Sequence, residues 1–144
     1  MPKRFIEKTL PYTQQQLYDL VSDIESYPKF LPWCEGARIN SRKGHKVFAD
    51  LLIGFDSING KYTSHVTFDP EHYTISVELV EGPFHHLVQK WEFAKVSDEE
   101  TSVLFDIDFK MKISLLEKII DQMFEKAFDK MMVAFEKRAK ELYE

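Results

Sequence analysis

The run SLLEKIIDQMFEKAFDKMMVAFEKRAKELY, from Ser114 to Tyr143, is the longest helix that this sequence can form, because it lacks glycine and proline and is rich in good helix formers. Ser114 and Glu117 have the spacing of a capping box. At about 1.5 Å per residue the helix would be on the order of 40 Å long, enough to cross a whole sheet. Its apolar stripe is broad in the middle turns and consists of Leu116, Ile119, Ile120, Met123, Phe124, Ala127, Phe128, Met131, Met132, Phe135, Ala139 and Leu142.

The segment before this helix, from Cys34 to Lys110, has the pattern of strands. Turn signals at residues 42–44, 57–60, 69–72, 81–83 and 97–100 divide it into about six strands, which predicts a meander with hairpin connections. Apolar and polar residues alternate, so one face should be buried and the other wet. The buried face is expected to hold Ala49, Leu51, Ile53, Phe55, Tyr62, Ser64, Val66, Phe68, Tyr73, Ile75, Val77, Leu79, Leu87, Gln89, Trp91, Phe93, Val103, Phe105, Ile107 and Phe109.

The N-terminal part adds a strand and two helical pieces. Lys3 to Leu10 reads as a short strand that Pro11 closes, and Thr13 can cap a following helix. Glu25 to Trp33 contains two prolines, which predicts a helical turn and a loop. We therefore expect one α+β domain over residues 1–144, with a curved antiparallel sheet wrapped around the long C-terminal helix.

Charge and composition restrict the partners and the setting. A net charge of −5 and a pI near 5.6 argue against broad nucleic-acid binding, and we expect no DNA partner. The lone Cys34 forms no internal disulfide, and the start MPKRFIEKTL has no signal-peptide core, so we expect a cytoplasmic protein. No apolar run approaches the roughly 20 residues of a membrane span, and contact with an inner membrane would be peripheral.

The residue pattern disfavours enzymatic chemistry. No Asp, Glu, Lys or His falls on the predicted inner face of the meander, where general acid–base catalysis would need one. The five histidines have no metal-ligand spacing, and Cys34 has no His partner at a readable spacing. We expect no catalytic residue, no metal and no cofactor.

Two features favour a cavity between the sheet and the helix. Flexible methionines on the helix, Met123, Met131 and Met132, can adapt to a variable ligand. Neutral polar side chains on the inner face need hydrogen-bond partners when they are buried. A ligand carbonyl, water or neighbouring backbone could supply them, and a close-packed core without a cavity remains open. These side chains are Tyr62, Ser64, Tyr73 and Gln89.

The chain closely resembles the coenzyme-Q-binding START-like family, which includes a mitochondrial coenzyme Q chaperone and a bacterial ribosome-association toxin. The motifs that carry the resemblance run nearly end to end: Leu10-Pro-Tyr-Thr-Gln-Gln-Gln-Leu-Tyr-Asp-Leu-Val21, Tyr27-Pro-Lys-Phe-Leu-Pro-Trp-Cys34, Glu81-Gly-Pro-Phe84 with Leu87 and Trp91-Glu-Phe93, and Phe135-Glu-Lys-Arg-Ala139. Trp33 is more like the mitochondrial type than the toxin type. The lack of an N-terminal presequence suggests a bacterial protein.

The resemblance implies a helix-grip fold of the START/Bet v 1 type and a non-enzymatic carrier. Its hydrophobic tunnel would take up ubiquinone or a related polyprenyl lipid and so support respiratory electron transfer and quinone biosynthesis. Trp91 could donate its indole N–H to a quinone oxygen, or could be only a core residue. The expected tunnel residues are Leu51, Ile53, Phe55, Tyr62, Tyr73, Gln89, Trp91, Phe105, Met123, Ala127, Phe128 and Met131.

The resemblance also implies two loops at the tunnel mouth. The first would consist of Tyr27, Pro28, Phe30, Leu31, Pro32 and Trp33, and the second of Gly82, Pro83 and Phe84. The first loop could insert into a bilayer interface, with Lys29 near anionic headgroups, or could pack down as a lid.

A toxin-type regulator that binds the ribosome and blocks subunit joining is the alternative function. It would need a basic surface patch, for which Lys3, Arg4, Arg38, Arg42, Lys43 and Lys46 are the candidates. A cyclase- or hydrolase-like relative is a third alternative, which an inward carboxylate or His pair would favour.

Overall fold

The computed structural model describes the chain except for residues 1–2, 32, 56–57, 83 and 113 and the side chains of residues 55, 58–59, 111 and 114–128. The elements follow in the order β1 (Lys3–Leu10), α1 (Gln14–Ser22), the 3-10 helix η1 (Ile24–Lys29), β2 (Cys34–Lys43), β3 (Lys46–Phe55), β4 (Ile58–Asp69), β5 (Thr74–Glu81), β6 (Phe84–Ser97), β7 (Glu100–Met111) and α2 (Ser114–Tyr143).

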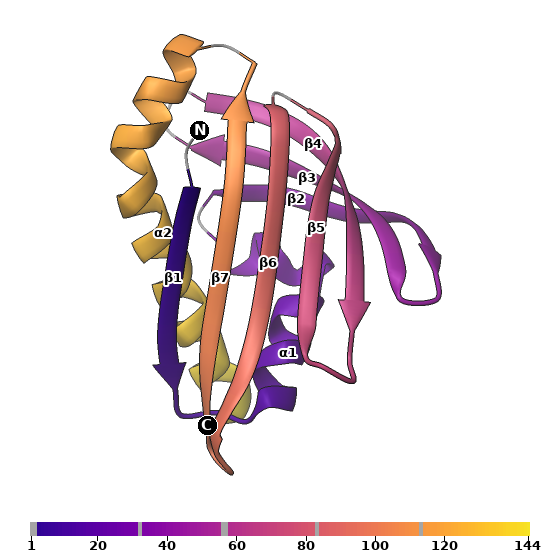
Figure 1. The fold of residues 1–144 in the computed structure, drawn as a ribbon, viewed down its shortest axis with the longest axis vertical. Coiled ribbons are helices and arrows are strands. Elements are labelled where there is room, and N and C mark those ends of the chain that lie inside the picture. The colour runs from indigo at the N-terminus through magenta and orange to yellow at the C-terminus, as the bar shows by residue number, and fades with distance from the viewer. Residues whose placement is uncertain (1–2, 32, 56–57, 83, 113) are drawn as a thin grey trace.

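The strands form one antiparallel sheet in the order β1-β7-β6-β5-β4-β3-β2. The six strands β2 to β7 are a meander, as predicted, and β1 adds to its far side by pairing with β7. The sheet is curved, and the helices lie on one side of it (Figure 1). The predicted α+β fold with a curved sheet and a long C-terminal helix is confirmed.

The predicted alternation of faces is confirmed in the described strands. Tyr62, Val66, Ile75, Phe105 and Phe109 are all buried on the face that the helices cover, while their neighbours along each strand are more exposed. Ile53, Leu79 and Gln89 share this face but are only half-buried, as is Tyr73, which lies in the turn before β5 with a φ of 50°. The side chain of Phe55 lies outside the described residues.

The predicted helix starts agree with the structure. Thr13 caps α1, because its hydroxyl accepts from the Gln16 backbone N–H (3.1 Å) and the Gln16 side chain accepts from the Thr13 N–H (3.0 Å). The helix α2 runs from Ser114 to Tyr143 as expected, although the proposed capping box at its start lies outside the described side chains.

The second half of α2 is fixed to the rest of the molecule by apolar and polar contacts. Its inward residues Met131, Met132, Phe135 and Ala139 are buried. At its end, the Tyr143 hydroxyl donates to the Gln16 carbonyl (2.9 Å). None of the described helices is long and apolar enough to cross a membrane.

The edge strand β1 brings charge to the inner face, which the sequence did not lead us to expect. Arg4 pairs with Ile107 and Lys8 with Val103, so both cations share the face of those buried residues. The Lys8 ammonium lies 2.7 Å from the Glu136 carboxylate of α2. This ion pair ties the sheet edge to the helix.

Candidate ligand site inside the sheet

Aromatic rings close one end of the space between the sheet and α2. The Phe135 ring of α2 lies 5.5 Å from Trp91, 5.8 Å from Tyr27 and 5.3 Å from Phe30, measured between centroids. Trp91 also lies 4.4 Å from Phe105. These edge and tilted contacts are favourable beyond their buried area.

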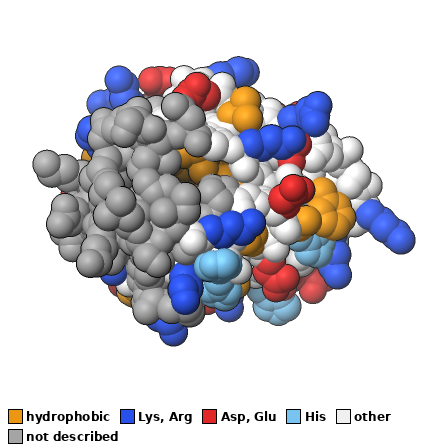
Figure 2. All heavy atoms as spheres, turned by 90° about the horizontal axis from the view of Figure 1, so that it is seen from above, with side chains coloured by type: hydrophobic (Ala, Val, Ile, Leu, Met, Phe, Trp, Pro, Cys, Tyr) orange, Lys and Arg blue, Asp and Glu red, His pale blue; other side chains and the backbone are white. Residues whose placement is uncertain are grey.

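A second aromatic group lies at the other end of the sheet, where β6 begins and β7 ends (Figure 1). Phe84 packs edge-on against Tyr62 (6.0 Å) and Phe109 (6.2 Å). Gly82 passes so close to Tyr62 that an added Cβ would lie 2.6 Å from the tyrosine Cβ, so glycine is needed there. Figure 2 views this end from above and shows hydrophobic side chains near its centre, with Lys, Arg and His side chains around them.

Three buried titratable groups, Tyr27, Cys34 and Tyr62, lie near one another inside the apolar region. Burial raises the pKa of all three, that of the Cys34 thiol to about 11, and the proximity of Tyr62 and Cys34 raises the pKa of Tyr27 further. All three therefore remain protonated near neutral pH and can act only as neutral hydrogen-bonding groups.

Tyr27, Cys34 and Tyr62 differ from one another in their hydrogen bonds. The Tyr27 hydroxyl donates to the Val21 carbonyl, and the Cys34 thiol donates to the Gly36 carbonyl at 3.4 Å. The Tyr62 hydroxyl forms no hydrogen bond with any part of the chain that the structure describes, although the residue is only 5% exposed. This hydroxyl is a neutral donor set in apolar surroundings, and an oxygen atom of a bound ligand could accept its hydrogen bond.

The expected tunnel residues fall into three groups. Leu51 is buried directly opposite Tyr62 on β3, with Ile53 partly buried two residues further on. Trp91, Phe105 and Met131 are buried at the closed end, Gln89 is half-buried one inward position from Trp91, and Tyr73 packs against Tyr18 of α1. The side chains of Phe55, Met123, Ala127 and Phe128 lie outside the described residues.

The first expected entrance loop is packed onto the domain. Leu31 is 3% exposed, Tyr27 and Phe30 contact Phe135, and Trp33 is half-buried. The Trp33 carbonyl accepts from the Gly54 N–H at 2.9 Å. In the second loop Gly82 and Phe84 contact Tyr62, and Pro83 lies outside the described residues.

The described side chains in the middle of the inner face of β2 to β7 are apolar or neutral, and charged ones share this face near strand ends, where Arg42 pairs with Val47 and Lys95 with Thr101. Among the residues that the structure describes, no group of three His, Cys, Asp or Glu residues is arranged to hold a metal ion. The site can therefore offer apolar surface and a few neutral donors, which is the usual make-up of a pocket for a largely apolar molecule.

Known proteins resemble this chain both in sequence and in fold. A family described as polyketide cyclase/dehydrase and lipid transport matches residues 10–136. A ribosome association toxin, RatA, from Rickettsia prowazekii is 44% identical over 138 residues, which cover 94% of each chain. The mitochondrial coenzyme Q-binding protein COQ10 homolog B from Xenopus laevis is 30% identical; the match covers 94% of this chain and 57% of that protein.

A solved structure extends the similarity to the whole fold. The solution structure of an 18 kDa protein from Caulobacter crescentus is 36% identical, covers 99% of each chain and has a TM-score of 0.84. The two sequence relatives are named for binding and for ribosome association, whereas the family description also includes cyclases and dehydrases.

Proposed function

The chain belongs to the polyketide cyclase/dehydrase and lipid transport family, and we propose that it binds ubiquinone or a related polyprenyl lipid between its sheet and α2. The observation that carries this proposal is the place of Tyr62, which is 5% exposed on the apolar inner face and whose hydroxyl has no hydrogen bond to the described part of the chain. Its raised pKa keeps the phenol protonated at neutral pH, so it would donate to a quinone carbonyl.

The isoprenoid part of such a ligand would lie against the apolar inner face. Leu51, Leu87 and Ile107 supply buried aliphatic surface there, and Phe84 and Phe109 supply aromatic surface. Burial of an isoprenoid tail against this surface would be favourable at roughly 25 cal/mol per Å² of apolar area. The protein would act as a carrier without chemistry of its own, which agrees with the apolar and neutral side chains in the middle of the inner face and with the names of its sequence relatives.

The first experiment asks whether the protein carries such a lipid. Organic extracts of the protein, purified from its own host, are analysed by mass spectrometry beside an Ala49→Trp variant, because Ala49 is fully buried on the inner face. A polyprenyl quinone in the wild type that is lost from a folded variant supports the proposal. No bound lipid in either protein, together with no binding of added ubiquinone, contradicts it.

The second experiment tests the role of Tyr62. The Tyr62→Phe variant loses one neutral hydrogen bond and should bind ubiquinone roughly three- to tenfold more weakly than wild type. Quenching of intrinsic tryptophan fluorescence measures this affinity. The matched control is Tyr73→Phe, which removes a hydroxyl that bonds to Gln15 near α1. Equal affinity in folded Tyr62→Phe and wild type would remove this hydroxyl from the binding site and leave lipid binding itself untouched.

A second candidate function is association with the ribosome. It is favoured by the relative from Rickettsia prowazekii, whose match spans nearly all of both chains and whose name states that activity. Sedimentation of the purified protein with ribosomal subunits at physiological salt tests it. Failure to sediment with either subunit would contradict this function but not lipid binding.

A further inference from the structure

The candidate basic residues do not form one patch in the folded chain. Lys3 and Arg4 lie on β1, at one edge of the sheet. Arg38, Arg42 and Lys43 lie on β2, at the opposite edge, with Lys46 at the start of β3. Any contact with a polyanion must therefore use one edge or the other.

The β2–β3 hairpin concentrates positive charge that has no counter-charge. Arg42, Lys43 and Lys46 are exposed, and none forms an ion pair within the described part of the chain. Lys43 pairs directly with Lys46 across the two strands, and like charges in that position are destabilising. A bound anion would remove this repulsion.

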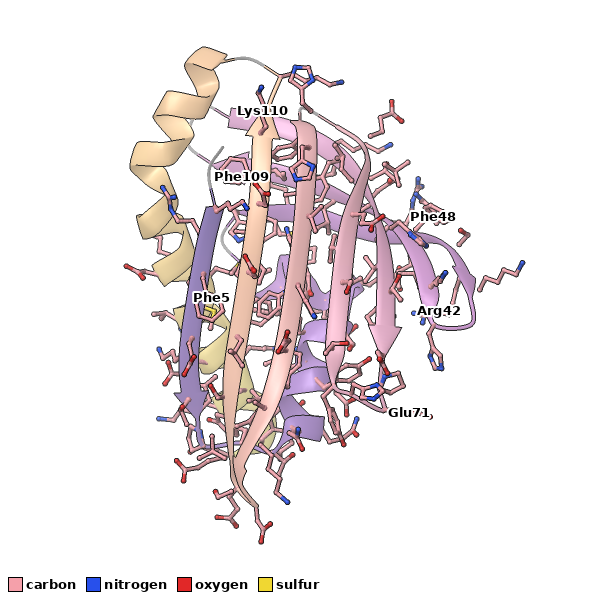
Figure 3. All side chains as sticks on the ribbon, viewed as in Figure 1. Phe5, Arg42, Phe48, Glu71, Phe109 and Lys110 are labelled. Carbon is pink, nitrogen blue, oxygen red and sulfur yellow. The ribbon has the colours of Figure 1, made fainter. Side chains whose placement is uncertain are left out.

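A pair of stacked rings lies beside these cations, and one of the rings is exposed. Phe48 is 41% exposed, and its ring stacks on that of His65 with centroids 4.8 Å apart and planes 27° from parallel. In the register, Ser41 pairs with Phe48 and Phe48 with His65, so the ring pair shares the outer face with Lys43 and Lys46. Figure 3 labels Phe48 and Arg42 on this hairpin, at the opposite edge of the view from α2.

Two further cations continue the patch along the outer face. Arg38 and Lys61 both approach the Asp50 carboxylate, at 3.3 and 3.5 Å, and both are well exposed. One carboxylate thus serves two cations. Five cations lie on this hairpin or on the neighbouring strand β4, although the whole chain has a net charge of −5.

We propose that the outer face of the β2–β3 hairpin binds single-stranded or loop RNA. Phosphates would lie on Lys43 and Lys46, and an unpaired base would stack on Phe48, as bases do on the aromatic platforms of single-strand binding proteins. Arg42 pairs with the buried Val47 and so points to the other face of the hairpin. This inference rests on the second candidate function and names the surface that would contact ribosomal RNA.

The groove along the outside of α2 fits RNA less well. It has a volume of about 510 Å³ and contains Lys29, Lys130 and Lys137. Asp129 and Glu141 also line it, and its one aromatic ring, Phe30, is covered by the Arg138 guanidinium 5.6 Å from the ring centroid. The groove thus offers cations without an open aromatic face, and it supplies a control surface.

The experiment compares charge reversal on the two surfaces. Binding of a fluorescein-labelled oligouridylate of about 16 nucleotides is measured by anisotropy over a range of potassium chloride concentrations. The Lys43→Glu/Lys46→Glu variant should bind the oligouridylate at least roughly tenfold more weakly than wild type. Because two phosphate contacts are lost, the steepness with which log K of binding falls against log salt concentration should decrease by about 1.4. Phe48→Ser should weaken binding roughly tenfold with little change in the slope. Lys130→Glu/Lys137→Glu should bind like wild type.

Three outcomes would overturn the assignment. Wild type could fail to bind RNA, or the α2 control variant could lose as much affinity as the hairpin variant. The hairpin variant could also keep its RNA affinity and lose only its affinity for phosphatidylglycerol vesicles, which are assayed in parallel. Sedimentation with ribosomal subunits distinguishes an error in the proposed RNA-binding surface from an error in the proposed ribosome association. If the hairpin variant still sediments with them, the surface is wrong and the function stands. If wild type binds RNA through the hairpin but does not sediment, the function is wrong and the surface stands. Unchanged ubiquinone affinity shows that the variants are folded.

Discussion

Asp50 is a carboxylate buried on the outer face of β3, where the sequence pattern predicted a wet surface. The Thr63 hydroxyl donates to it at 2.5 Å, and this bond, with a further one from Asn40, lowers its pKa to about 2. The carboxylate is thereby available to hold Arg38 and Lys61.

This environment predicts an acid-sensitive share of the stability. The pKa of Asp50 is lower in the folded than in the unfolded chain, where it would be about 3.9, so its contribution is present above about pH 4 and is lost as the pH falls toward 2. Urea unfolding of Asp50→Asn at neutral pH should give a free energy of unfolding about 1–2 kcal/mol lower than wild type, and the difference should shrink near pH 2. Asp106→Asn, at an exposed position of the same face, should show no such difference.

At the same scale, the face of each strand residue could be predicted, because side chains alternate with period two. The meeting of Tyr27, Cys34 and Tyr62 could not. It depends on the turn of η1 and on two successive registers, Cys34 opposite Ile53 and Ile53 opposite Gly60, which no local pattern encodes. The apolar surroundings of the Tyr62 hydroxyl are likewise a property of the folded chain.

Among the elements, α1 is short, and a helix of nine residues depends on its cap and on tertiary packing. Thr13→Ala removes one hydrogen bond of the capping box and should lower the free energy of unfolding by about 1 kcal/mol in urea titrations. Thr13→Ser keeps the hydroxyl and should be close to wild type. An equally large loss in the serine variant would show that the cap is not the cause.

The limits of the elements were predictable because prolines, glycines and polar turns mark them, and Ser114 begins a run without either breaker. The position of β1 in the sheet could not be predicted. Strand order is set by long-range pairing, and β1 pairs with β7, a strand almost one hundred residues later. That pairing puts Arg4 and Lys8 on the inner face and separates them from the cations of β2.

For the whole molecule, lipid binding should appear as added stability. A ligand that binds only the folded state at about 100 times its Kd stabilises by about 2.7 kcal/mol, which for a chain of this length corresponds to a rise in Tm of roughly 5–10 °C. Ubiquinone in detergent should produce this rise in wild type, a smaller one in Tyr62→Phe and none in a folded Ala49→Trp protein. Detergent alone is the control, and an equal rise in all three proteins would indicate a surface effect.

The net charge of the whole molecule was a poor guide to where its charged side chains would gather. The acidic total argued against polyanion binding, yet folding separates the charges so that the β2–β3 hairpin is locally basic. Only the order of the strands decides which cations become neighbours.

Cys34 gives the molecule a built-in chemical reporter. It is the only cysteine of the chain, is 4% exposed and follows directly after the Tyr27–Trp33 segment. Because the thiol is both covered and held protonated by a pKa of about 11, iodoacetamide should react with it only when a local opening of the domain exposes it. The alkylation rate of the native protein therefore measures these openings, and a slower rate with added ubiquinone would show that the ligand stabilises the closed domain.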